Sequence, residues 1–180
     1  MKSYNYAHRK GIEEISWERF GKLSRTLTEQ LGDKQIDIVI GIARAGLFPA
    51  TALACALRRE LYPVLITRRV NDVVQYESPI WRVDVPSTVA GQRLAVIDEI
   101  ADSGETLALV AARALERGAR RVWTVSLIAH SWADPKPDFT ALVSDALVIF
   151  PWDRQVYTNG GWQLHPEIEA AIEAQQNTSR

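Results

Sequence analysis

The sequence predicts an α/β protein in which a mostly parallel, twisted sheet is flanked by helices. Short apolar strands alternate with helical segments along the chain, and some strands are almost entirely apolar, as in IDIVIGI at residues 36–42. Alternating order favours parallel strands, and continuous apolar runs are typical of strands buried on both faces. With 180 residues, 47% of them hydrophobic, the chain suits a single domain with a substantial core.

The first half of the chain supplies two helices and two strands. Apolar side chains recur at helical spacing over residues 17–31, after a serine that suits an N-cap and before a glycine. The buried strand at 36–42 follows. A helix rich in small residues is expected over 47–59, where it can pack closely on the sheet, and the next strand over 62–69.

The second half begins with an irregular segment. Residues 70–86 combine polar residues, two prolines and β-forming residues, which favours a long loop or a loose hairpin. The remaining expected elements are strands over 93–98, 121–129 and 146–152 and helices over 106–117 and 165–175.

Composition excludes several classes of function. The net charge of -1 argues against a broad surface for nucleic acid, and no apolar run approaches membrane-spanning length. The lone Cys55 allows no intrachain disulfide, and His8, His130 and His165 are too far apart in sequence to suggest a metal cluster. The N-terminus lacks the apolar core of a signal peptide. We expect a cytoplasmic protein with no membrane or nucleic-acid partner.

The segment LAVIDEIADSGETL at residues 94–107 carries the strongest chemical signal. An apolar strand reaches Asp98 and Glu99, and Asp102 then opens a short turn. Ligands of parallel sheets bind outside the carboxyl ends of the strands. The small residues, hydroxyls and helix N-terminal amides of the turn suit a phosphate, and the acids suit sugar hydroxyls or hydrated Mg²⁺. The segment therefore predicts a site for a phosphorylated sugar.

One alternative is purely structural. DSGE also fits a capping box with Asp102 as the N-cap and Glu105 reaching back, which leaves Asp98 and Glu99 unexplained.

Other known phosphate-binding loops fit this sequence poorly. GIARAG at residues 41–46 lacks the Lys-Ser/Thr that completes a Walker motif, and the sequence contains no G-x-G-x-x-G, so ATPase and dinucleotide-binding functions lose their main support.

Residues 94–107 resemble the PRPP-binding signature of the type I phosphoribosyltransferases, where PRPP is phosphoribosyl pyrophosphate. GIARAGLFPA resembles the pyrophosphate loop of that family. SWERF near the start and KPDFTALVSDALVIFPWD near the end are similar to the bacterial and archaeal branch that includes xanthine-guanine and hypoxanthine enzymes. By motif placement, the resemblance covers roughly residues 14–155.

The resemblance implies a reaction. In this family a base nitrogen attacks C1 of PRPP through a ribosyl-cation-like transition state, which releases pyrophosphate and forms a nucleoside monophosphate. We therefore expect a pentosyltransferase of purine salvage that uses a 6-oxopurine, with Mg²⁺ as the cofactor of PRPP. By the same analogy we expect a homodimer or a larger homo-oligomer.

The resemblance also implies site residues. Asp98 and Glu99 hold the ribose hydroxyls and help to seat Mg²⁺, and Asp102 is the catalytic group that shuttles the base proton. Arg44 and the amide of Ala45 bind pyrophosphate, in a loop where many relatives have a non-proline cis peptide bond. The remaining PRPP-binding residues, which cradle the 5′-phosphate, are Ser103, Gly104, Glu105 and Thr106.

A flexible loop closes over PRPP in this family, and residues 70–86 match it in position. Arg68 and Arg69 at its base either reach pyrophosphate or form a solvated basic strand end. The chain is then one phosphoribosyltransferase domain over residues 1–180. Its base-recognising hood comprises about residues 130–165 and the N-terminal segment, as estimated from motif placement.

The expected base-binding residues depart from the family pattern. Val148 and Trp152 match hood positions at or near the base, although Trp152 also suits a core aromatic. Leu147 stands where the xanthine-guanine pattern has a stacking aromatic, and His130 stands where it has a lysine. Both departures lead us to expect weak use of 6-oxopurines. They do not affect the residues that are expected to bind PRPP.

Two other functions stay open. The chain could transfer the same group to a different nitrogen acceptor, or it could be a non-catalytic PRPP-binding regulator. Regulators that bind nucleic acid usually have a basic face or an added domain. Asp102 and the ARAG turn favour turnover, because a pure sensor does not need a proton acceptor.

Overall fold

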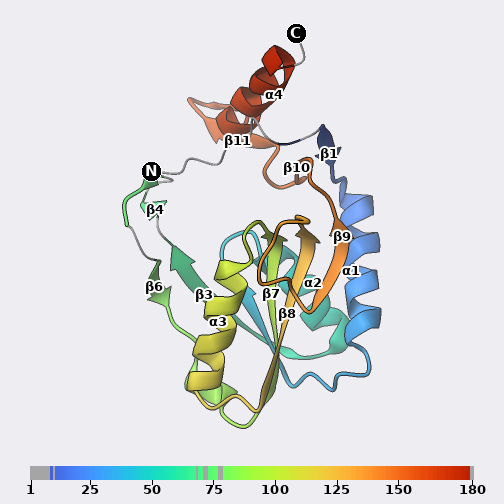
Figure 1. The fold of residues 1–180 in the computed structure, drawn as a ribbon, viewed down its shortest axis with the longest axis vertical. Helices are drawn as coiled ribbons and strands as arrows, with labels where there is room; N and C mark the ends of the chain where they lie inside the picture. The colour runs from blue at the N-terminus through green and yellow to red at the C-terminus, as the bar shows by residue number, and fades with distance from the viewer. Residues whose placement is uncertain (1–8, 10, 68, 71–72, 77–78, 179–180) are drawn as a thin grey trace. The chain divides into compact units, whose positions relative to one another are not determined.

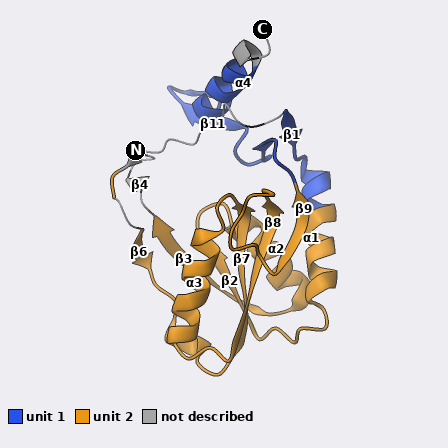
Figure 2. Ribbon diagram, in the orientation of Figure 1, with its two compact units in different colours: residues 1–21, 144–180 blue, residues 22–143 orange. Residues whose placement is uncertain are grey.

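The chain divides into two units, one of residues 22–143 and one that joins residues 1–21 to residues 144–180 (Figure 2). The computed structural model describes residues 9, 11–67, 69–70, 73–76 and 79–178 (Figure 1). None of the helices in this described part is both long and apolar enough to span a membrane.

A six-stranded sheet forms the centre of the larger unit. Strand β6 pairs with β3 in the antiparallel sense and all other neighbours are parallel, which confirms the expected mostly parallel sheet. The spatial order is β6 (Ile80–Val83), β3 (Glu60–Thr67), β2 (Ile38–Ile42), β7 (Arg93–Ala101), β8 (Arg121–Ala129) and β9 (Phe139–Val143).

Helices cover both faces of this sheet, α3 in front and α2 behind in the view of Figure 1. Side chains of alternate residues in β2 point to opposite faces of the sheet. Because helices cover both faces, every residue of the strand is buried. Ile40 lies in the core cluster that includes α3 (Glu105–Glu116). On the other face, a Cβ added to Gly41 would lie 2.8 Å from the Cβ of Ala50 in α2 (Leu47–Leu57). The glycine therefore allows the close packing of helix on strand.

The segment expected as a long loop or a loose hairpin contains a short hairpin and one further strand. Strands β4 (Arg69–Val70) and β5 (Val73–Val74) pair antiparallel, and β6 joins the edge of the main sheet. The 3₁₀ helix η2 (Ser87–Val89) follows. The sequence IWRV in β6 has the β-branched and aromatic residues of an edge strand, which the neighbouring polar residues and prolines obscured.

The smaller unit is built from two strand pairs and a helix. Strand β1 (Ile12–Glu14) pairs parallel with β10 (Leu147–Ile149), and β11 (Gln155–Thr158) pairs antiparallel with β12 (Gly161–Leu164). Helix α1 (Trp17–Leu31) belongs to both units, since the division falls after Gly21. The last helix is α4 (Pro166–Thr178).

Candidate functional site

The two adjacent acids lie near the carboxyl end of β7. The strand continues to Ala101, three residues beyond the expected end at Asp98, so Glu99 belongs to the strand as well. The Glu99 amide donates a hydrogen bond to Asp98 Oδ1 over 3.0 Å. Loss of hydration, together with the neighbouring charge of Glu99, raises the pKa of Asp98 well above its usual range. The surroundings thus disfavour ionisation of both carboxyl groups at once, and a cation placed beside them would favour their ionised forms.

The ARAG turn packs directly against this acid pair. A Cβ added to Gly46 would lie 2.7 Å from Asp98 Oδ1 and 2.5 Å from the carbonyl oxygen of Ile42. Only a residue without a side chain fits there. The peptide bond between Ala43 and Arg44 is cis, as the family resemblance suggested for this loop. Two segments that are more than fifty residues apart in sequence thus meet at one end of the sheet.

The turn after β7 leads into α3 through a glycine in the left-handed region. Gly104 has φ +85° and is the N-cap of the helix. The Glu105 amide donates to Ser103 Oγ over 3.3 Å. The alternative in which Asp102 caps the helix is therefore wrong, because the three-residue turn 102–104 places the N-cap at Gly104, two residues beyond Asp102. The amides of the turn and of the first helical residues lie at the helix N-terminus, where anions are favoured.

Asp102 instead accepts a hydrogen bond from the segment after β8. Trp132 Nε1 donates to Asp102 Oδ1 over 3.2 Å, and His130 Nε2 lies 4.0 Å from the same oxygen. The imidazole and indole rings are stacked, with centroids 4.4 Å apart and planes 15° apart. His130 is 2% exposed and Trp132 48% exposed. The structure thus brings His130 beside Asp102.

Trp132 is not among the site residues expected from the sequence. One signal could have found it, since β7 and β8 are adjacent parallel strands and the residues that follow them meet at one edge of the sheet.

Arg44 is exposed and Ala45 is partly buried in the turn between β2 and α2. Arg68 lies outside the described residues, and Arg69 is the first residue of β4.

The other expected base-binding residues belong to the smaller unit. Leu147 is buried in the core cluster of that unit, together with Ile168 of α4. Val148 pairs with Glu13 in the strand register. The Trp152 ring stacks on Phe150 at 4.8 Å, with an interplanar angle of 8°. The Leu147 side chain is thus part of a core, and Trp152 is part of an aromatic cluster.

The acid pair has the chemistry of a site for Mg²⁺ that arrives with its substrate. Within the described residues, His, Cys, Asp and Glu side chains do not gather in groups of three or more that could hold a metal. Mg²⁺ usually keeps several waters and takes one or two carboxylates together with substrate phosphates. Asp98 and Glu99 fit that need, because they are adjacent carboxyl groups near the carboxyl end of β7, and Mg²⁺ would favour the ionised form of Asp98 that burial disfavours.

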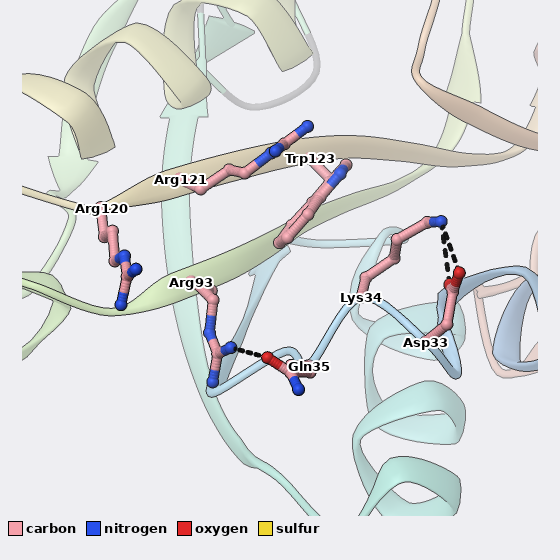
Figure 3. Close-up of a pocket in the computed structure, with 7 residues that line it drawn as sticks. All are labelled: Asp33, Lys34, Gln35, Arg93, Arg120, Arg121 and Trp123. Atoms are coloured by element: carbon pink, nitrogen blue, oxygen red, sulfur yellow. Dashed lines mark hydrogen bonds and ion pairs between the residues drawn. The ribbon is translucent and has the colours of Figure 1, made fainter.

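A separate cavity of about 570 Å³ lies at the opposite end of β7 and β8 (Figure 3). Its cations have partners nearby: Lys34 pairs with Asp33 at 2.9 Å, and the Arg121 guanidinium lies over the Trp123 ring at 4.8 Å. Arg93, the first residue of β7, also lines it. This basic cavity does not include the predicted site.

Comparisons with known proteins identify the family of this chain. A family model described as "Phosphoribosyl transferase domain" matches residues 11–158. The chain is 26% identical over 145 residues to the xanthine-guanine phosphoribosyltransferase of Idiomarina loihiensis, which covers 79% of this chain and 88% of that relative. It is 29% identical over 163 residues to the enzyme of the same name from Cereibacter sphaeroides, covering 81% and 89%.

Solved structures share the fold. A purine phosphoribosyltransferase from Pyrococcus horikoshii Ot3 has a TM-score of 0.74 at 22% identity, and the match covers 83% of this chain and 99% of that chain. A hypothetical protein from Neisseria gonorrhoeae with bound ppGpp has a TM-score of 0.69 at 19% identity, covering 95% and 99%. The matched family domain spans most of the chain, and it contains the ARAG turn, the Asp98–Glu99 pair and the 102–106 turn. The chain therefore belongs to the phosphoribosyl transferase family.

Proposed function

We propose that this protein transfers the 5-phosphoribosyl group of PRPP to a purine base, which gives a nucleoside monophosphate and pyrophosphate in purine salvage. The observation that carries the proposal is the meeting of the Asp98–Glu99 pair with the ARAG turn and the 102–106 turn at one end of the sheet. The xanthine-guanine relatives support a 6-oxopurine as the base.

The turn at the start of α3 suits the 5′-phosphate. Its backbone amides lie at a helix N-terminus, and Ser103 and Thr106 add hydroxyl groups that can donate to phosphate oxygens. Glu105 contributes its amide, while Gly104 allows the backbone to approach closely. Proteins bind phosphate tightly by such convergence of amides and hydroxyls.

The acid pair and the ARAG turn suit the rest of PRPP. Asp98 and Glu99 can accept hydrogen bonds from the ribose hydroxyls, and charged acceptors strengthen such bonds. Arg44 and the Ala45 amide can bind the pyrophosphate, on which negative charge develops as the C1–O bond breaks. Mg²⁺, when bound with PRPP, would supply further positive charge at the leaving group.

Asp102 is the group that we assign to the base. Its carboxylate can accept the proton that the attacking base nitrogen loses as the bond to C1 forms.

The Leu147 side chain is buried in the smaller unit, so it offers no stacking surface to the base. This supports weak use of 6-oxopurines.

A second candidate is a nucleotide-binding regulator without turnover. The Neisseria gonorrhoeae neighbour, solved with bound ppGpp, favours this candidate because ppGpp also places phosphates on a ribose. A third is the same transfer to a different nitrogen acceptor.

One experiment separates these functions. Pyrophosphate release is measured with PRPP, Mg²⁺ and a panel of hypoxanthine, guanine, xanthine, adenine, uracil and cytosine, while calorimetry measures PRPP binding. Release with an oxopurine supports the proposal, and release only with another base supports a different acceptor. Binding of PRPP without release for any base would leave the regulator as the better description.

We also propose a homodimer or larger homo-oligomer, carried over from the family resemblance, and a location in the cytoplasm, carried over from the composition of the sequence. Light scattering after size-exclusion chromatography tests the assembly, and cell fractionation tests the location. A monomer throughout the concentration range of the assay would contradict the first.

A further inference from the structure

The segment after β8 holds the backbone on both sides of Asp102. The His130 amide donates to the carbonyl oxygen of Ala101 over 3.1 Å, and the Asp134 amide donates to that of Ser103 over 2.9 Å. Asp102 lies between these two carbonyl groups in the chain. The segment from His130 to Asp134 therefore fixes the backbone from which the Asp102 carboxylate projects.

The same segment also reaches the carboxylate itself. Trp132 Nε1 donates to Asp102 Oδ1 over 3.2 Å. An indole has a single N–H and no acceptor, so Trp132 must be the donor and Asp102 the acceptor in this contact. A hydrogen bond to a charged acceptor is stronger than a neutral one, and it restricts rotation of the carboxylate. With Oδ1 held, Oδ2 can face the base nitrogen.

His130 holds the indole ring in place. The two rings stack at 4.4 Å, and only 2% of His130 is exposed, so the imidazole is a fixed support in the protein interior. Trp132 is 48% exposed, which places part of its ring at the protein surface while its N–H faces Asp102. A group held by packing on one side and a hydrogen bond on the other has little freedom to turn.

We propose that Trp132 is a positioning residue for phosphoribosyl transfer. Its indole N–H orients the Asp102 carboxylate to accept the base proton, and His130 fixes the indole. This inference rests on the proposed function, because it assigns Asp102 to the base. It adds to the site a tryptophan thirty residues away from the acid that it orients.

The substitution Trp132→Phe tests the N–H separately from the ring. Phenylalanine can keep the stack on His130 but cannot donate to Asp102. We expect kcat to fall about tenfold, the lower end of the effect of losing a partner that orients a reacting group. The KM for PRPP and the melting temperature should stay at the parent values. The control is Trp123→Phe, near the amino end of β8, where the Arg121 guanidinium lies over the indole ring, and it should leave kcat unchanged.

The kinetic outcomes separate positioning from base stacking. Trp132→Ala removes both ring and donor. If Trp132→Phe retains full kcat and only Trp132→Ala raises the KM for the base, then the ring contacts the base and the positioning role is wrong. A fall in kcat that is the same for Trp132→Phe and Trp123→Phe would also overturn it.

A measurement without turnover keeps the inference separate from the proposed function. In ¹⁵N-labelled protein, Trp132→Phe identifies the indole N–H signal of Trp132 by its loss. Replacing Asp102 by Ala should move that signal upfield, because the N–H loses its charged acceptor, whereas Asp102→Asn should move it less. The Trp123 signal should not move. An unmoved Trp132 signal would overturn the inference, whereas absence of turnover by the parent with every base would overturn only the proposed function.

Discussion

The two ends of strands β7 and β8 use charge in opposite ways. At the amino end, Arg93 forms an ion pair with Asp37 at 2.8 Å, and the hydrogen bonds from Arg93 lower the pKa of Asp37 to about 2. At the carboxyl end, Asp98 lies next to another acid and its pKa is raised. An ion pair of opposite charges stabilises the folded chain, whereas two adjacent acids destabilise it when both are ionised. The difference marks the carboxyl end as the part of the sheet arranged for a ligand.

The largest expected effect comes from removing the charge of the acid pair. We predict that Asp98→Asn/Glu99→Gln weakens PRPP binding about a hundredfold or more, since two hydrogen bonds to charged groups are each worth about 1.5–3 kcal/mol. Calorimetric titration with and without Mg²⁺ measures it. Asp37→Asn, which removes a carboxylate from the other end of the sheet, is the control and should bind PRPP as the parent does. Equal affinity in the double variant and the parent would remove the acids from the site.

Asp102→Ala should come next. We expect turnover to fall about 10²-fold, the usual scale for a positioned acid or base, with little change in PRPP affinity. Because Gly104 is the N-cap of α3, the melting temperature should not show the loss of a helix cap. Kinetics and thermal melts on one preparation check both points. A folded variant with parental turnover would show that the base proton goes elsewhere.

Gly46→Ala tests whether the ARAG turn and the acid pair must touch. The added Cβ would approach Asp98 Oδ1 within 2.7 Å, so either the turn or the carboxylate must move. We predict a loss of about 1–3 kcal/mol in unfolding free energy, the usual cost of overpacking, together with weaker PRPP binding. Gly21→Ala is the control, because nothing lies within 4 Å of a Cβ there and alanine favours the helix. Denaturant titration of both variants measures the difference, and an equally stable Gly46→Ala protein would mean that the turn is adaptable.

The smallest effect belongs to the amino end and depends on pH. The folded pKa of Asp37, about 2, is below its ordinary value of 3.8, so the ion pair contributes stability above pH 3.8 that is lost as the pH falls towards 2. The parent should therefore be more stable than Asp37→Asn near neutral pH, and the gap should close on acidification. Thermal melts from pH 6 to pH 2 measure the gap. A gap that stays constant over this range would show that the pair contributes nothing through its charge.

The site could be read in part from the sequence because its acids and glycine turns are contiguous. Asp98, Glu99 and residues 102–106 stand in one segment, and the order of strands and helices predicts which end of the sheet they occupy. Trp132 could not be found that way, since its contact with Asp102 exists only when two adjacent strands bring their following segments together.

Side-chain direction was the other limit. ALVIFPW is apolar throughout, so it has no alternation to show which residues face a core, and Leu147 proved to be one that does. The strands β1, β9, β11 and β12 were not expected because runs of three to five residues are too short for a clear pattern. The capping alternative failed for a related reason, since the sequence does not show that β7 continues to Ala101.

The two backbone hydrogen bonds around Asp102 also limit how this part of the chain can vary in length. They join His130 and Asp134, four residues apart after β8, to Ala101 and Ser103, two residues apart at the end of β7 and just beyond it. A residue inserted between His130 and Asp134 would put the two bonds out of step, so one would break or the turn that carries Asp102 would shift. Among homologous chains, insertions and deletions should therefore fall outside this short span, even though it is a surface connection of the kind that usually tolerates them.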